Sequence, residues 1–195
     1  MKQIGALPLI LLENGQVEVY LVTSRGGQRW IIPKGNPMRG LSACDVAALE
    51  AREEAGVIGT VLDACLGEFT LRGRNKKCRV SVYPLIVEEK LLHWDEVSER
   101  QWRRCDLKTA RTLVDSRGLA SLLGSLSAKK VNRLLAEDAQ ANGREPKLMP
   151  KGTYDQLAQG QRRQLFDRDP DSAWGNIEHP LTRTEVSQRL AGDGA

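Results

Sequence analysis

The sequence predicts an α/β domain followed by a C-terminal extension, and three observations support this prediction. Short runs rich in β-branched residues recur through the first two-thirds of the 195-residue chain, as is typical of strands. A helix with start and stop signals is predicted at 45–55, between the third and the fourth of these runs. From about residue 127 apolar residues become sparse, so we expect a domain at 1–126 and an extension at 127–195 that is partly helical or disordered.

The first two predicted strands, 4–12 and 17–23, form a hairpin. An Asn-Gly pair at 14–15 separates them, and such a pair between two apolar runs is a strong signal for a tight turn. A third, short strand is predicted at 30–32. It ends at Pro33, because proline cannot donate a hydrogen bond to a strand ladder.

The predicted helix at 45–55 is marked at both ends. Ser42 and Asp45 have the spacing of a capping box, in which two side chains satisfy free backbone amides of the first turn. Gly56 follows the last helical residue, where a left-handed glycine commonly ends a helix. The remaining predicted elements are strands at 57–62, 65–72 and 79–87, helices at 107–113, 118–123 and 128–141, and a short amphipathic element at 184–190.

Composition excludes several classes of protein. No apolar run approaches the roughly 18–20 residues of a membrane span, and we read no export signal, so we expect a cytoplasmic protein without a membrane partner. The four cysteines form no Cys-x-x-Cys pair of the zinc-binding type. The net charge of +4 does not demand a nucleic-acid partner, and an aromatic content of 5% leaves few platforms for base stacking.

Three glutamates on the predicted helix form the strongest candidate site. Glu50, Glu53 and Glu54 are spaced i, i+3 and i+4, which places the three carboxylates on one face of the helix. Like charges at these spacings repel one another, whereas a divalent cation would turn the repulsion into attraction. Carboxylate oxygens are ligands that Mg²⁺ prefers. A solvated acidic face is the alternative reading, but the flanking glycines and the strand before the helix favour a metal site.

The segment 35–57 resembles the signature of the Nudix hydrolases, G-x5-E-x7-R-E-U-x-E-E-x-G-U, in which U is a bulky aliphatic residue. The residues kept are Gly35, Glu50, Glu53, Glu54, Gly56 and Val57. The chain departs from the signature at Leu41, Leu49 and Ala51. In the family the first two of these positions hold a Glu and an Arg that resemble a structural ion pair. Because two apolar side chains can replace a buried ion pair without loss of stability, we expect the two leucines to fill its place.

The resemblance extends over about residues 3–125, where the chain looks like bacterial relatives of the diphosphoinositol-polyphosphate phosphohydrolases. The segments that carry it are 4–8, 24–35, 36–40, 80–85 and the Trp94-Asp-Glu-x-x-x-Arg-x-Trp102 stretch. It implies an α/β/α sandwich with a mixed β-sheet. It also implies cleavage of a phosphoanhydride in a diphosphate- or polyphosphate-containing small molecule, of the diphosphoinositol polyphosphate or diadenosine polyphosphate type.

The same resemblance implies roles for individual residues. Glu50 and Glu54 would be the main ligands of Mg²⁺, with Mn²⁺ as the alternative ion, and the Gly35 carbonyl would complete the coordination. Glu53 would be a further ligand or the base for the attacking water, so Glu50 and Glu53 are the predicted catalytic residues. Glu96 and Glu99 are weaker candidates for one more carboxylate. The predicted phosphate-binding residues are Arg25, Arg29, Lys34, Arg39, Arg72, Arg74 and Lys76.

Two other functions stay open at this point. The changes at Leu41 and Leu49 favour a catalytically weak Nudix-like domain that binds a nucleotide or polyphosphate as a regulator. The basic run at 72–79 suits a solvated turn, and RNA or DNA binding is a third, less favoured reading because the run lacks the interleaved aromatic residues of such sites. The sequence carries no signal for an oligomeric state.

Overall fold

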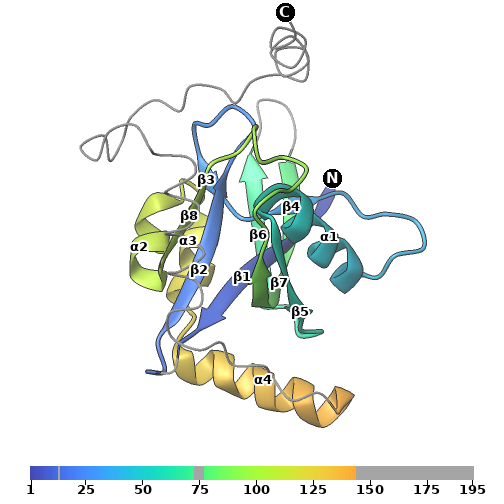
Figure 1. Ribbon diagram of the computed structural model, residues 1–195, viewed down its shortest axis with the longest axis vertical. Coiled ribbons are helices and arrows are strands. Elements are labelled where there is room, and N and C mark those ends of the chain that lie inside the picture. The colour runs from blue at the N-terminus through green and yellow to red at the C-terminus, as the bar shows by residue number, and fades with distance from the viewer. Residues whose placement is uncertain (13, 73–76, 144–195) are drawn as a thin grey trace, which may run out of the picture. The chain divides into compact units, whose positions relative to one another are not determined.

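The computed structural model describes residues 1–143 except Glu13 and 73–76 (Figure 1). The predicted element at 184–190 and the predicted phosphate-binding residues Arg74 and Lys76 therefore lie outside the described residues. The helices are α1 (Ala43–Ala55), α2 (Leu107–Leu113), α3 (Arg117–Gly124) and α4 (Ala128–Asn142). The strands are β1 (Lys2–Leu11), β2 (Val17–Thr23), β3 (Trp30–Ile31), β4 (Lys34–Gly35), β5 (Val57–Val61), β6 (Gly67–Arg72), β7 (Lys77–Lys90) and β8 (Trp102–Asp106).

In the described part of the chain these strands form one mixed sheet with the main order β3-β2-β1-β7-β5. The central pair, β1 and β7, is parallel, and the other pairs are antiparallel. β4 pairs with β1, β6 with β7 and β8 with β2. The mixed α/β fold is thus confirmed.

Helices cover both faces of the sheet, with α1 on one side and α2 and α3 on the other (Figure 1). Successive side chains of a strand point to opposite faces, and β1 shows this directly. Leu7, Leu9 and Leu11 join the core under α2, α3 and α4, while Ala6 and Ile10 join the core under α1. The second core is built against small residues of α1, which lets this helix lie close to the sheet.

The predicted helix signals of α1 are confirmed, although the helix begins two residues earlier than expected. Ser42 caps it, its side chain accepting from the Asp45 amide, and the Asp45 side chain accepts in return from the Ser42 amide. Gly56 ends it in the left-handed region at φ 58°, and its amide donates to carbonyls of the last turn. Capping contacts therefore satisfy part of the free backbone groups at both ends of the helix that carries the acidic residues.

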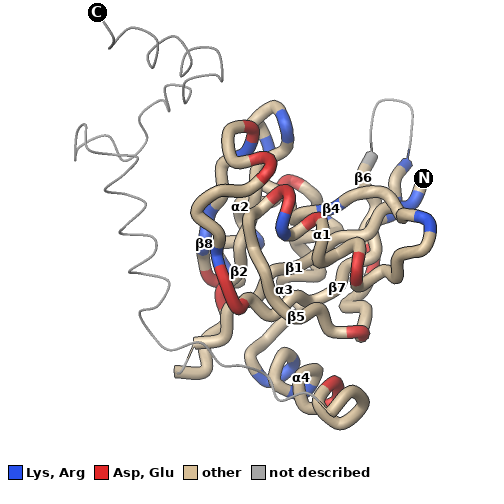
Figure 2. Tube along the Cα trace, turned by 45° about the vertical axis from the view of Figure 1, so that its right-hand side comes forward, with Lys and Arg blue, Asp and Glu red and all other residues tan. Residues whose placement is uncertain are grey.

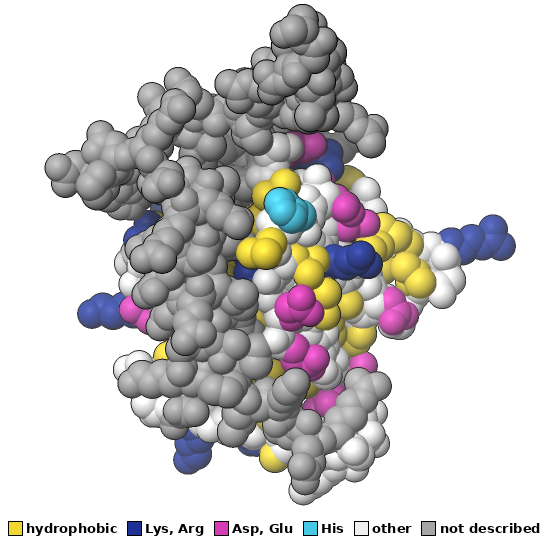
Figure 3. All heavy atoms as spheres, in the orientation of Figure 1, with side chains coloured by type: hydrophobic (Ala, Val, Ile, Leu, Met, Phe, Trp, Pro, Cys, Tyr) yellow, Lys and Arg dark blue, Asp and Glu magenta, His cyan; other side chains and the backbone are white. Residues whose placement is uncertain are grey.

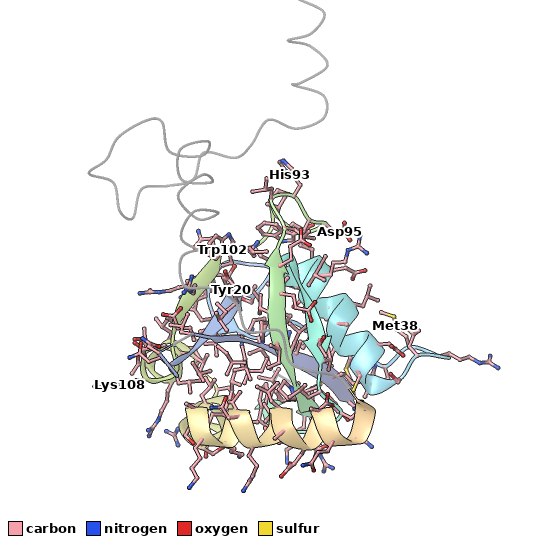
Figure 4. All side chains as sticks on the ribbon, turned by 60° about the horizontal axis from the view of Figure 1, so that its bottom comes forward. Tyr20, Met38, His93, Asp95, Trp102 and Lys108 are labelled. Atoms are coloured by element: carbon pink, nitrogen blue, oxygen red, sulfur yellow. The ribbon has the colours of Figure 1, made fainter. Side chains whose placement is uncertain are left out.

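Two backbone hydrogen bonds tie the segment between β7 and β8 to the end of α1. The Leu91 amide donates to the Gly56 carbonyl at 2.7 Å, and the Glu96 amide donates to the Glu53 carbonyl at 3.2 Å. This connecting segment, residues 91–101, therefore lies beside the last turn of α1. In Figure 4 the labelled residues His93 and Asp95 belong to this segment and lie beyond one end of α1.

Aromatic packing supports the same junction. The Trp94 ring lies so close to Gly56 that a Cβ there would come within 2.5 Å of it. The Lys90 ammonium lies 3.5 Å from the centre of the Trp94 ring and 5.0 Å from that of the Trp102 ring. Lys90 is buried, and cation–π attraction to two indoles partly replaces the water it has lost.

The helix predicted at 128–141, inside the extension, is confirmed as α4. Its Val131, Leu134 and Leu135 are buried in the same core as Leu119 and Leu7. Among the described residues, no helix has the length and apolar character that crossing a membrane requires.

Candidate active site

The three glutamates lie in one cleft at the end of α1, as their spacing predicts. Glu50 and Glu54 are one turn apart and buried, at 8% and 6% exposed, whereas Glu53 is half-buried. All three line a cleft of about 490 Å³ together with residues of β4 and of the β2–β3 turn. Figure 2 shows acidic and basic positions close together beside α1 and β4.

Glu50 lies directly on the backbone of β4. A Cβ placed on Gly35 would come within 1.6 Å of Glu50 Oε1, so only glycine leaves room for this carboxylate. Burial raises the pKa of Glu50 to about 7, with the nearby charges of Glu54 and Glu53 adding to the effect, while Lys34 opposes it. Around the Glu50 carboxylate, burial and negative neighbours therefore outweigh the positive charge of Lys34.

Glu54 has both carboxylate oxygens engaged by the protein. Its Oε2 accepts a hydrogen bond from the Lys34 amide at 3.0 Å, and its Oε1 accepts from the Arg100 guanidinium. Burial raises the pKa of Glu54, and the positive charges of Arg100 and Lys34 oppose that rise. Each oxygen can accept more than one bond, so ligation of a metal stays compatible with these contacts.

Glu96 brings a fourth carboxylate to the cleft, from the segment 91–101. It accepts from Arg25 Nη2 at 2.5 Å and from Arg100 Nε. Burial acts to raise the pKa of Glu96, but the hydrogen bonds from Arg25 and Arg100 outweigh it and lower the pKa. Glu96 therefore stays charged between two arginines.

The predicted phosphate-binding residues divide into two groups. Arg25 and Lys34 line the cleft, where Arg25 is largely exposed at its rim. Arg29 and Arg39 are exposed and do not line it. The side chain of Arg72 falls outside the described residues, so its predicted role, like those of the neighbouring basic residues, stays a prediction.

The expectation about the two leucines was wrong for Leu41. Its side chain is 46% exposed in the loop between β4 and α1, so it does not fill a buried position. Leu49 is half-buried and lies in a separate groove with Val57 and Ile58. An apolar residue type indicates a preference for burial, but the path of a surface loop decides whether burial occurs.

Sequence reasoning missed Arg100 and gave Glu96 little weight. The two residues are spaced i, i+4, which suits an ion pair, but the sequence did not indicate that this pair would face α1. Other polar lining residues that were missed are Gln3, Ser24 and Asn36.

The residues of the cleft fit a divalent ion that is held partly by substrate. Among residues 1–12, 14–72 and 77–143, no three His, Cys, Asp or Glu side chains converge closely enough to hold a metal by themselves. Mg²⁺, however, is commonly bound through one or two carboxylates with phosphates and water completing its shell. The Glu50 carboxylate, poor in positive charge and lying against the Gly35 backbone, suits that mode.

Comparison with known proteins supports the resemblance. No family model matches the chain. Nudix hydrolase 16, mitochondrial, of Arabidopsis thaliana is 32% identical over 101 residues, which cover 46% of this chain and 56% of that protein. The chain spans about half the length of the first curated relatives that it matches.

Solved structures show the fold. A crystal structure of the C. elegans Ap4A hydrolase in a binary complex superposes with a TM-score of 0.51 at 22% identity, covering 70% of this chain and 98% of that one. The NUDIX domain of Shewanella oneidensis NrtR, complexed with ADP ribose, has a TM-score of 0.51 at 12% identity over 68% and 88% of the two chains. The chain has the mixed α/β Nudix fold. In sequence it is similar to curated Nudix hydrolases.

Proposed function

We propose that this protein is a metal-dependent pyrophosphohydrolase of the Nudix type, which cleaves a phosphoanhydride bond in a diphosphate- or polyphosphate-containing small molecule. One observation carries the proposal. The cleft joins Glu50, Glu53 and Glu54 to the basic residues Arg25 and Lys34, so that acidic groups for a metal face basic groups for phosphate. The similarity to curated Nudix hydrolases supports the same reaction class.

Glu50 and Glu53 have different roles in the proposed reaction. Bound Mg²⁺ would neutralise phosphate oxygens and stabilise the charge that develops on the leaving group. Within the described residues, neither the Glu50 nor the Glu53 carboxylate accepts a hydrogen bond, so both remain available to a metal ion or a water. Glu50 is held against Gly35 and suits ligation. Glu53, half-buried in the cleft, suits the role of base for the attacking water.

The lining of the cleft supports a substrate that is recognised through its phosphates. No aromatic side chain is among the described lining residues, and only Ile31 and Met38 are large and apolar. Figure 4 shows Met38 in the loop that precedes α1. A nucleobase would therefore find little to stack on, which favours diphosphoinositol polyphosphates. Diadenosine polyphosphates are the second class to test, because an Ap4A hydrolase shares the fold.

The test is Mg²⁺-dependent hydrolysis of a panel of both substrate classes by the full chain, with the products separated by ion-exchange chromatography, because a diadenosine polyphosphate yields two nucleotides and no free phosphate. We expect turnover that needs Mg²⁺ and falls at least about 100-fold in Glu53→Gln, the scale of a lost general base. Glu137→Gln, in an exposed ion pair of α4, is the matched control and should keep full activity. Turnover that is unaffected by Glu53→Gln would contradict the proposed role of this residue.

A regulatory domain that binds a polyphosphate without turnover is the second candidate. Leu41 and Leu49 stand where the Nudix signature has a Glu and an Arg, and this departure favours it. Tight binding of a panel compound together with absence of any hydrolysis product would support this candidate over the enzyme.

A further inference from the structure

We propose that Arg100 is a positioning residue that fixes the Glu54 carboxylate for metal binding. The proposal rests on the proposed function and deepens it. Arg100 belongs to neither α1 nor the Nudix signature, and it enters the cleft from the segment between β7 and β8.

The contacts of Arg100 span three parts of the fold. Its side chain is 4% exposed, and it donates to Glu54 on α1, to Glu96 on its own segment and to the Thr23 carbonyl at the end of β2, the last at 2.7 Å. A guanidinium is planar, and its donors point in fixed directions. Three acceptors on three segments therefore fix its orientation and, in turn, that of the Glu54 carboxylate.

Glu54 is held from two sides. The Lys34 amide binds Oε2 while Arg100 binds Oε1, so both rotation and displacement of the carboxylate are restrained. A ligand oxygen that is oriented in this way loses little freedom when a metal binds, and partners of metal ligands are known to act by such orientation.

The ion pairs continue from Arg100 to the rim of the cleft. Glu96 accepts from both Arg100 and Arg25, and the exposed fraction of the arginine side chains rises from 4% at Arg100 to 73% at Arg25. The buried acid and the exposed phosphate-binding candidate are thus joined through Glu96. Buried ion pairs contribute little net stability compared with apolar packing, so fold stability alone does not account for a guanidinium at this place.

The test compares two conservative variants of the full chain. Arg100→Lys keeps the charge but loses the planar fork. Arg104→Lys is the matched control, because Arg104 pairs through Nε with Glu18 on the sheet and does not line the cleft. The probe is Mn²⁺, measured by electron paramagnetic resonance both alone and with methylenediphosphonate as a non-hydrolysable anhydride analogue. Melting temperature, kcat and KM are measured alongside.

We expect folded Arg100→Lys to bind Mn²⁺ about 10–100-fold more weakly and to lose kcat by a similar factor, with a smaller change in KM. Arg104→Lys should match the wild type. Mn²⁺ binding by folded Arg100→Lys that is equal to or tighter than that of the wild type would overturn the proposal, because Arg100 would then be a bystander or a competing cation.

A second variant covers the case in which Arg100→Lys does not fold. Glu96→Gln keeps the shape of the side chain and weakens the hold on Arg100, so we expect a smaller but measurable loss of Mn²⁺ affinity. An affinity that stays unchanged would overturn the proposal. If the wild type binds Mn²⁺ but hydrolyses no anhydride, the proposed enzyme fails while the Mn²⁺ comparison still decides the role of Arg100. A wild type that binds no Mn²⁺, either alone or with methylenediphosphonate, overturns both.

Discussion

Replacing Gly35 by alanine tests whether the Glu50 carboxylate must lie against the backbone of β4 for activity. The new Cβ would lie 1.6 Å from Glu50 Oε1 and 2.2 Å from its Cδ, whereas Cβ contacts below 3.0 Å are essentially never seen. The carboxylate oxygen must therefore withdraw by at least about 1.4 Å, which exceeds the roughly 1 Å misplacement that can cost about 100-fold in rate.

The expected loss is therefore about 100-fold in kcat, or about 2.7 kcal/mol in the barrier. Stability should change little, because the displaced atoms are the end of a flexible side chain. Alanine also reduces the entropy of the unfolded chain, which stabilises the native state by about 0.4–1 kcal/mol. The assay is Mg²⁺-dependent hydrolysis of the anhydride substrate, followed by its products, together with the melting temperature.

The matched control is Gly26→Ala, in the turn between β2 and β3. No heavy atom lies within 4 Å of its added Cβ, and its φ is not positive. This variant should keep the rate and gain the same small stability from the loss of unfolded-chain entropy. A Gly35→Ala enzyme with a kcat within about threefold of the wild type would refute the claim that Glu50 acts from its place against β4, since such a displacement should cost far more.

Further predictions concern stability, pH and metal. Gly56→Ala should lower the free energy of unfolding, measured by urea titration, by about 1–3 kcal/mol more than Gly143→Ala does. Both glycines have positive φ, but only at Gly56 would the added Cβ collide with Trp94. Burial lowers the pKa of Lys90 from 10.5 to about 7, so the unfolded chain binds more protons between these values. The contribution of Lys90 to the free energy of unfolding should then rise with pH across that window, and Lys90→Met should flatten the curve; an unchanged slope would contradict it. Chelation of divalent ions should abolish turnover, and added Mg²⁺ should raise the melting temperature of the wild type but not of Glu50→Gln; equal shifts would remove Glu50 from the metal site.

The sequence predicts α1 well because its signals are local. The capping residues and the closing glycine act within one turn of the helix ends, and the i, i+3, i+4 spacing of three glutamates fixes a shared face. The strand β8 was not predicted. Its sequence, Trp-Arg-Arg-Cys-Asp, lacks apolar alternation, and its pairing with β2 decides its conformation.

The rest of the site depends on contacts between distant segments. Arg100 meets Glu54 across 46 positions of the chain, and neither residue type nor local spacing indicates that meeting. Leu41 shows the converse, since its apolar side chain suggested burial although the loop leaves it at the surface. The sequence therefore indicates which side chains can bind a metal or a phosphate. The contact partners of those side chains and their exposure to solvent become known only from the fold.

The two main-chain hydrogen bonds that Leu91 and Glu96 donate to the end of α1 do not depend on side-chain type. Because amides and carbonyls are present whatever the side chain, the anchorage survives most substitutions in the segment. Leu92, between the two anchors, and Val97, directly after the second, are exposed. Figure 3 shows apolar, acidic and basic side chains mixed on the viewed surface. Substitutions at these two exposed positions can therefore accumulate without moving Glu96 away from the last turn of α1.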